Sequence, residues 1–158
     1  LLHYTDGKFA SVTALEPDRR SFRKLNEWAS ANITGDVTLV QAGAWNEDTV
    51  KCFTDQAGRQ SRVAGQGKET QMRALDSVLS DRLCTYLKMD VEGAEREAIA
   101  GAEKTIRQYA PKLNIAAYHR SEDFFQLPLL IHALQPSYRL YLRHHPYVPA
   151  WDTNLYAI

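Results

Sequence analysis

The chain has 158 residues, and its 19 Lys and Arg balance its 19 Asp and Glu, so the formal net charge is zero. This length suits one domain with a single core, and we expect residues 1–158 to form one domain. A balanced charge gives no bulk attraction to nucleic acid or to an anionic membrane surface. No apolar run reaches the ~20 residues that a membrane span needs. We therefore expect neither nucleic acid nor a membrane as a partner. Cys84 lies in an expected buried strand and suits a small core residue better than a disulfide partner, so we expect a cytoplasmic protein.

Apolar runs of strand length alternate with helical patterns, which predicts an α/β fold. The expected strands lie near Ser11 to Leu15, Val37 to Gln41, Thr49 to Thr54, Thr70 to Leu75, Leu83 to Met89, Lys112 to Tyr118, Tyr138 to Arg143 and Asn154 to Ile158. The expected helices lie near Asp18 to Asn32, Gly93 to Tyr109 and Ser121 to Leu134. The stretch from Asp55 to Glu69 is polar and lacks periodicity, so we expect a disordered surface loop. No helix separates the last two strands, which predicts an antiparallel pair at one edge of a mixed sheet.

Two acids follow a short apolar strand in the run Tyr86-Leu87-Lys88-Met89-Asp90-Val91-Glu92-Gly93-Ala94-Glu95. Ligands of open α/β sheets bind just outside the carboxyl ends of the strands. Asp90 and Glu92 therefore lie where such a sheet places its ligand-binding and catalytic residues. The alternative is that both acids only begin the helix that follows, since acids favour helix N-termini. Glu95 lies within that helix, and we expect it to make a surface or capping contact. Lys88 lies in the strand, where a buried lysine needs a partner, so we expect it to pair with an acid.

A second acid ends the strand in Val12-Thr13-Ala14-Leu15-Glu16-Pro17-Asp18. Pro17 suits the first turn of a helix, where its missing N–H costs little. In nucleotide-binding α/β folds, an acid at the end of the second strand accepts hydrogen bonds from ribose hydroxyls. The alternative for Glu16 is a helix cap.

These segments together resemble the FkbM family of S-adenosylmethionine-dependent methyltransferases. The other matching segments are Val37-Thr38-Leu39-Val40-Gln41-Ala42-Gly43-Ala44, the Ala74-Leu75-Asp76 turn, and the stretch from Pro111 to Ile158. The Lys-x-Asp-x-Glu-Gly-Ala-Glu run is the most specific part. The resemblance implies a Rossmann-like class I methyltransferase sheet, mostly parallel, with an antiparallel C-terminal strand pair. It also implies S-adenosylmethionine as the cofactor.

One feature of that family has no counterpart here. The family begins with a strand and a glycine-rich turn that holds the methionine part of the cofactor, whereas Gly7 stands alone before the Glu16 strand. We therefore expect an N-terminally incomplete domain whose first strand is missing from between the Glu16 and Asp90 strands. Three solutions follow: a longer parent chain supplies the strand, the two strands pair directly, or a second copy fills the gap as a homo-oligomer.

The resemblance also indicates which residues bind the cofactor. Glu16 would hold the ribose, and the turn at Gly43, Ala44 and Trp45 would border the adenine. Gly43 has no side chain, so only its backbone could contact the ring. Trp45 could stack on the ring or cover the pocket, and a partly buried surface aromatic is the equal alternative. Asp90 would lie beside the methyl group that is transferred.

Methyl transfer requires a group that aligns the acceptor and removes its proton. Asp90 and Glu92 are candidates, and His119, which follows the next strand, is the best general base because imidazole titrates near neutral pH. A structural histidine is the alternative. His144 and His145 could join them around the acceptor or a metal, but their spacing matches no metal motif, so we expect no metal.

The sequence thus predicts an S-adenosylmethionine-dependent enzyme that O-methylates a hydroxyl on a sugar, a polyketide or another small-molecule acceptor. Two alternatives stay open. An inactive, truncated domain could serve as a binding or assembly module. A nucleotide-sugar or NAD enzyme would also use an acid after the second strand, although the Lys88 to Glu95 run argues against it.

Overall fold

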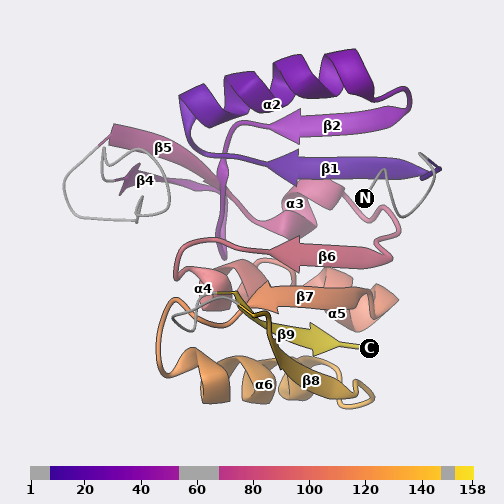
Figure 1. The fold of residues 1–158 in the computed structure, drawn as a ribbon, viewed down its shortest axis with the longest axis vertical. Helices are drawn as coiled ribbons and strands as arrows, with labels where there is room; N and C mark the ends of the chain where they lie inside the picture. The colour runs from indigo at the N-terminus through magenta and orange to yellow at the C-terminus, as the bar shows by residue number, and fades with distance from the viewer. Residues whose placement is uncertain (1–7, 54–67, 147–151) are drawn as a thin grey trace.

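The computed structural model describes residues 8–53, 68–146 and 152–158. Helices and strands alternate along these ranges, as the sequence predicts (Figure 1). Four strands lie in two parallel pairs, and their arrows point the same way in Figure 1. The pairs are β1 (Ser11–Leu15) with β2 (Asp36–Val40), and β6 (Tyr86–Met89) with β7 (Lys112–Ala116). The carboxyl ends of all four strands therefore lie toward one edge of the molecule.

The C-terminal strands run against this direction. β9 (Thr153–Ala157) pairs antiparallel with β7 on one side and with β8 (Leu140–His144) on the other. The four-stranded order β6-β7-β9-β8 confirms the predicted mixed sheet with an antiparallel C-terminal pair.

A smaller sheet was only partly predicted. β5 (Lys68–Arg73) pairs antiparallel with β4 (Thr49–Phe53) and parallel with the two-residue β3 (Gly43–Ala44). Strand β3 is too short to show in a hydrophobic pattern. Most of the loop expected between Asp55 and Glu69 lies outside the described residues.

The helix expected over Asp18 to Asn32 is α2 (Arg19–Asn32). Asp18 is its N-cap, and its carboxylate accepts hydrogen bonds from the backbone N–H groups of Arg20 and Ser21 at 3.1 and 2.8 Å. The Ser21 hydrogen bond is the main cause that lowers the pKa of Asp18. A side chain that accepts from two of the first free N–H groups stabilises the start of a helix.

The single helix expected from Gly93 to Tyr109 is wrong, because the structure divides it into α4 (Glu95–Ala100) and α5 (Glu103–Tyr109). Asp76 of α3 (Leu75–Leu79) explains the break. Its backbone N–H donates to the Gly101 carbonyl at 2.8 Å. Its carboxylate accepts from the Lys104 and Thr105 N–H groups, each at 2.9 Å, and so caps the new first turn of α5.

The core lies between the four-stranded sheet and helices α4, α5 and α6 (Asp123–Leu134). Strands contribute alternate apolar residues, and helices contribute residues at three- and four-residue spacing. Representative members, all at most 9% exposed, are Leu87, Met89, Leu113, Ile115, Leu155, Ile99, Ile106, Leu127 and Ile131. None of the helices in the described ranges has the length and hydropathy to cross a bilayer.

The two parallel pairs belong to separate sheets in the described part of the chain. β1 pairs with β2, and β6 pairs with β7, but no ladder joins β1 to β6. Direct pairing of these two strands, one of the three expected solutions, is therefore wrong. A strand from a longer parent chain and a strand from a second copy both stay predictions.

We predict that Gly101→Ala destabilises the protein. A Cβ at Gly101 would lie 1.9 Å from the Trp45 carbonyl oxygen and 3.2 Å from the Ala74 Cα, and backbone atoms cannot rotate away. We expect the free energy of unfolding to fall by about 3 kcal/mol, the upper end of the usual cost of overpacking. Urea denaturation measures the change. Ala100→Gly, beside it on an exposed position, is a control for helix propensity alone, and equal losses for both variants would contradict the steric account.

We also predict that amide hydrogen exchange separates the strands. β7 is paired on both sides, whereas β1 and β6 each have one edge without a ladder among the described residues. Unpaired edge amides are open to solvent, so β1 and β6 should take up deuterium faster than β7. Equally slow exchange in β1, β6 and β7 would show that another strand covers both edges in solution, and a concentration series would tell whether a second copy supplies it.

Candidate functional site

His119 lies at the centre of the candidate site, two residues beyond the buried Ala117 that follows β7. Its side chain is 8% exposed. The Nδ1 atom lies 2.7 Å from Oε1 of Glu95, which is hydrogen-bond distance. The Nε2 atom lies 3.4 Å from Oε2 of Glu92 and 3.6 Å from Oδ1 of Asp90, which is too long for a strong hydrogen bond. The predicted residues Asp90, Glu92 and His119 thus do come together, and Glu95 joins them.

The backbone after β6 turns sharply to bring these groups together. Glu92 has φ +55° and Gly93 has φ +94°, so two consecutive residues are left-handed. Glycine adopts this conformation readily, but a glutamate does so at a cost. The Val91 N–H donates to Oε1 of Glu95 at 3.1 Å, which ties the turn to the first residue of α4. The turn therefore aims the Glu92 carboxylate at the His119 ring.

Glu95 was expected to make a surface or capping contact, and that expectation is wrong. The residue is fully buried at 0% exposure. The sequence contains a signal for this position, because Glu95 is three, four and seven residues before the apolar Ala98, Ile99 and Ala102. Residues at that spacing share one face of a helix. An acid on the apolar face of a helix must be paired inside the protein.

Glu95 and His119 shift each other's pKa in opposite directions. Burial acts to raise the pKa of Glu95, but the hydrogen bond and the charge of His119 outweigh it, and the net shift is downward. For His119, burial acts to lower the pKa, and Glu95, followed by Glu92 and Asp90, raises it above the ordinary value. The surroundings thus favour an ionised Glu95 and a more basic imidazole.

Asp123, the first residue of α6, is a second buried acid that sequence reasoning missed. It is 1% exposed, and neither of its carboxylate oxygens has a hydrogen-bond partner among the described residues. Oδ1 lies 3.9 Å from Nε of Arg96. Burial and then the charge of Glu95 raise the pKa of Asp123. The same signal applies, since Asp123 precedes Leu127 and Ile131 on the apolar face of its helix.

Two further side chains lie around Asp90. Lys88 Nζ is 3.6 Å from Oδ2 of Asp90, so the expected pairing of Lys88 with an acid is confirmed, although the lysine is exposed rather than buried. The Tyr118 hydroxyl donates to Oδ1 of Asp90 at 3.3 Å. Burial, with Asp90 next, raises the pKa of Tyr118 to about 12. Tyr118 is therefore a neutral donor that helps to orient Asp90.

Glu16 follows β1 and is half-buried. Its backbone N–H donates to the Val40 carbonyl at 3.1 Å, and its Oε1 accepts from the Asp18 N–H at 2.8 Å. Asp18 caps α2, so the cap alternative for Glu16 is not what the structure shows. Burial is the main cause that raises the pKa of Glu16. A carboxylate has about four acceptor positions, so one backbone contact leaves room for two ribose hydroxyls.

Gly43 and Ala44 form strand β3 and are buried. A Cβ at Gly43 would lie 3.7 Å from Cβ of Pro17, so this turn adjoins the end of β1. Trp45 is half-buried, and Nζ of Lys51 lies 5.4 Å from its ring centroid. One ring face therefore contacts a cation of β4. The cofactor roles of Gly43, Ala44 and Trp45 stay predictions.

The side chains of His144 and His145 hydrogen-bond to β9 rather than to His119. Nδ1 of His144 is 3.0 Å from Oγ1 of Thr153, and Nε2 of His145 is 3.2 Å from the Tyr156 hydroxyl. No group of three or more His, Cys, Asp or Glu within the described ranges is arranged to hold a metal ion.

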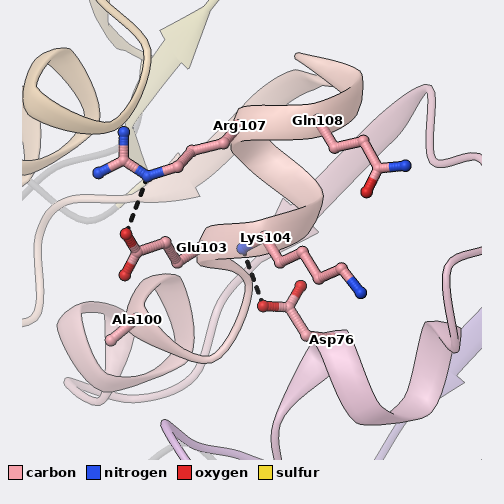
Figure 2. A pocket seen from close by; sticks show the side chains of 6 residues that line it. All are labelled: Asp76, Ala100, Glu103, Lys104, Arg107 and Gln108. Atoms are coloured by element: carbon pink, nitrogen blue, oxygen red, sulfur yellow. Dashed lines mark hydrogen bonds and ion pairs between the residues drawn. The ribbon is translucent and has the colours of Figure 1, made fainter.

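The charged side chains that line a surface groove between α3 and α5 pair with one another or with neighbouring groups (Figure 2). Glu103 and Arg107 point toward each other, with 2.8 Å between Oε1 and Nε. Asp76 points at the backbone of Lys104, and Nζ of Lys104 lies 2.5 Å from Oδ1 of Asp81. These pairs hold α3 against α5, and we assign the groove a structural role.

Comparison with known proteins agrees with the geometry. A methyltransferase FkbM domain family model matches residues 2–149. The crystal structure of methyltransferase FkbM from Methylobacillus flagellatus KT is similar, with 32% identity and a TM-score of 0.81. The match covers 99% of this chain and 39% of that one. No curated protein matches the chain. Because the family model spans most of its length, the chain belongs to the FkbM methyltransferase domain family.

Proposed function

We propose that the protein is an S-adenosylmethionine-dependent methyltransferase that O-methylates a hydroxyl group of a small molecule. One observation carries the proposal beyond family membership. The imidazole of His119 faces Asp90 and Glu92 at the carboxyl ends of parallel strands, where open α/β sheets bind their ligands. A base beside two acids is the arrangement that aligning and deprotonating a hydroxyl requires.

The residues at the two strand ends fit the cofactor. Glu16 offers free acceptor capacity to the ribose hydroxyls, and its raised pKa would fall on accepting those hydrogen bonds. Asp90 and Glu92 supply negative charge close to a sulfonium, with side chains 40% and 29% exposed. S-adenosylmethionine would supply an activated methyl group on a cationic sulfur and leave as a neutral thioether.

The proton of the acceptor would move to Nε2 of His119. Nε2 is buried behind Asp90 and Glu92 and has no hydrogen-bond partner among the described residues, so a hydroxyl that enters between these side chains would find its lone pair unused. Asp90 would first accept the hydroxyl's hydrogen bond as the acceptor approaches, and the hydroxyl would then turn its single hydrogen to Nε2. Tyr118 would keep the Asp90 carboxylate in place. Glu92 and Asp90 would then stabilise the protonated imidazole.

A small polar acceptor suits this site. The groups that converge there are carboxylates, an imidazole and a phenol, which hydrogen-bond hydroxyls well. A sugar or a polyketide hydroxyl is the acceptor class we favour. The two cysteines, Cys52 and Cys84, are free thiols, which suits a reducing compartment such as the cytoplasm.

The cofactor assignment predicts that Glu16→Ala weakens binding of S-adenosylhomocysteine. The loss should be about 1–3 kcal/mol, the range for hydrogen bonds to a charged group. Calorimetric titration measures it. Glu16→Gln keeps an acceptor for the Asp18 N–H, and should fall between the wild type and Glu16→Ala. Glu27→Ala, an exposed acid on α2, is the control, and equal affinity in all of these proteins would remove Glu16 from the site.

The chemical assignment predicts that Asp90→Asn lowers turnover on the order of a hundredfold while cofactor affinity stays roughly the same, since positioned acid–base groups contribute at least that much. Transfer of a labelled methyl group from S-adenosylmethionine to a panel of hydroxylated sugars and polyketides measures turnover. Asp81→Asn, at an exposed acid that pairs with Lys104, is the matched control. Near-normal turnover in Asp90→Asn would show that Asp90 takes no part in the reaction.

A further inference from the structure

A carboxylate that the reaction itself does not use lies directly behind the proposed base. Glu95 is fully buried on α4, and its Oε1 lies 2.7 Å from Nδ1 of His119. The other ring nitrogen, Nε2, points toward Asp90 and Glu92. The two faces of the imidazole therefore have different partners, with a buried acid behind and the candidate acceptor site in front.

The chemistry of this contact fixes the proton on one nitrogen. An ionised carboxylate can only accept hydrogen bonds, so Nδ1 of His119 must be the donor. A neutral imidazole carries one N–H, and Nε2 then has its lone pair free. A base must present that lone pair to the acceptor hydroxyl.

We propose that Glu95 is a positioning residue that holds His119 as the Nδ1–H tautomer, with Nε2 directed at the acceptor. This rests on the proposed function, in which Nε2 takes the acceptor's proton. Glu95 itself does not contact the acceptor, because it has no exposed surface. The Val91 N–H fixes the same Oε1 atom at 3.1 Å, so the turn that carries Glu92 and the ring that receives the proton share one anchor.

Other charged groups surround the pair and enter its titration. Asp90 and Glu92 face the ring from the turn after β6, and the Tyr118 ring lies 4.3 Å from it, centroid to centroid. Asp123 faces Glu95 from α6, and Arg96 and Arg120 act on Asp123. Of these groups, Glu95 is the one at hydrogen-bond distance from His119 in the described structure. Removing its charge should therefore change the pKa of His119 more than neutralising Asp123 does.

Nitrogen-15 NMR of labelled histidine side chains tests the proposal without an acceptor. The His119 signals are those lost in a His119→Gln variant. Wild-type His119 should titrate above the ordinary histidine pKa and, when neutral, show the Nδ1–H tautomer. Glu95→Gln keeps the shape and one acceptor oxygen but removes the charge, so the pKa should fall below the wild-type value. Asp123→Asn, at an equally buried acid that makes no hydrogen bond to the ring in the described structure, should leave the tautomer unchanged and shift the pKa less.

A neutral wild-type His119 in the Nε2–H form would overturn the proposal, and this result needs no variant to fold. A pKa in Glu95→Gln equal to that of the wild type would also overturn it. Calorimetric titration of S-adenosylhomocysteine into the same wild-type sample distinguishes a failure of the proposed function from a failure of the positioning role of Glu95. If S-adenosylhomocysteine does not bind while His119 titrates as expected, the result contradicts the proposed function but not the Glu95–His119 contact.

Discussion

The buried carboxylate of Glu95 constrains the part of the molecule where the candidate chemistry lies. A charge without solvent must be compensated by hydrogen bonds, and one oxygen of Glu95 receives two, from the Val91 N–H and from Nδ1 of His119. The first partner belongs to the turn after β6, and the second follows β7. Two strand ends are therefore tied to the start of α4 through a single atom.

The hydrogen bonds to buried Glu95 also determine where the neighbouring acids lie. The left-handed turn at Glu92 and Gly93 is the route by which the chain leaves β6 and still presents a backbone N–H to Glu95. That turn leaves the Glu92 and Asp90 carboxylates in front of His119. Burial, together with this collected negative charge, raises the pKa of Tyr118. The negative charge also raises the pKa of His119, against the lowering effect of burial. Structure and electrostatics at the site thus have one origin.

The other half of the candidate site depends on packing. Leu15, which precedes Glu16, and Val91, which follows Asp90, both pack against the core cluster that contains Ala44. The ends of β1, β3 and β6 are therefore held against one body of apolar side chains, although no ladder joins β1 to β6 in the described residues. Gly101 has no side chain, so the end of α4 can approach the Trp45 carbonyl, which follows β3.

Sequence patterns were sufficient for the elements whose signal is local. The strands that end at Leu15 and Met89, the helix that begins after Asp18, and the antiparallel pair at the C-terminus follow from periodicity and turn residues. The break between α4 and α5 does not, because Asp76 imposes it from more than twenty residues away in the chain. Strand β3 exists only through its pairing with β5.

The candidate site shows the same division. Asp90, Glu92 and His119 could be predicted because each stands at the end of an apolar strand. Glu95 was misread because an acid at a helix start is usually exposed, and its partner comes from another element. Only its spacing with Ala98 and Ile99 marked it as buried. A pairing between residues far apart in the chain, such as Glu95 with His119, is determined by the fold and gives only a weak signal in a single sequence.

We infer that the carboxyl ends of the parallel strands form one ligand site. Chemical-shift mapping with S-adenosylhomocysteine on the nitrogen-15-labelled chain tests it most directly. We expect the amides whose signals move to lie at Glu16, at Gly43 to Trp45 and at Asp90 to Glu95. Shifts confined to the groove between α3 and α5, or no shifts at saturating ligand, would contradict it.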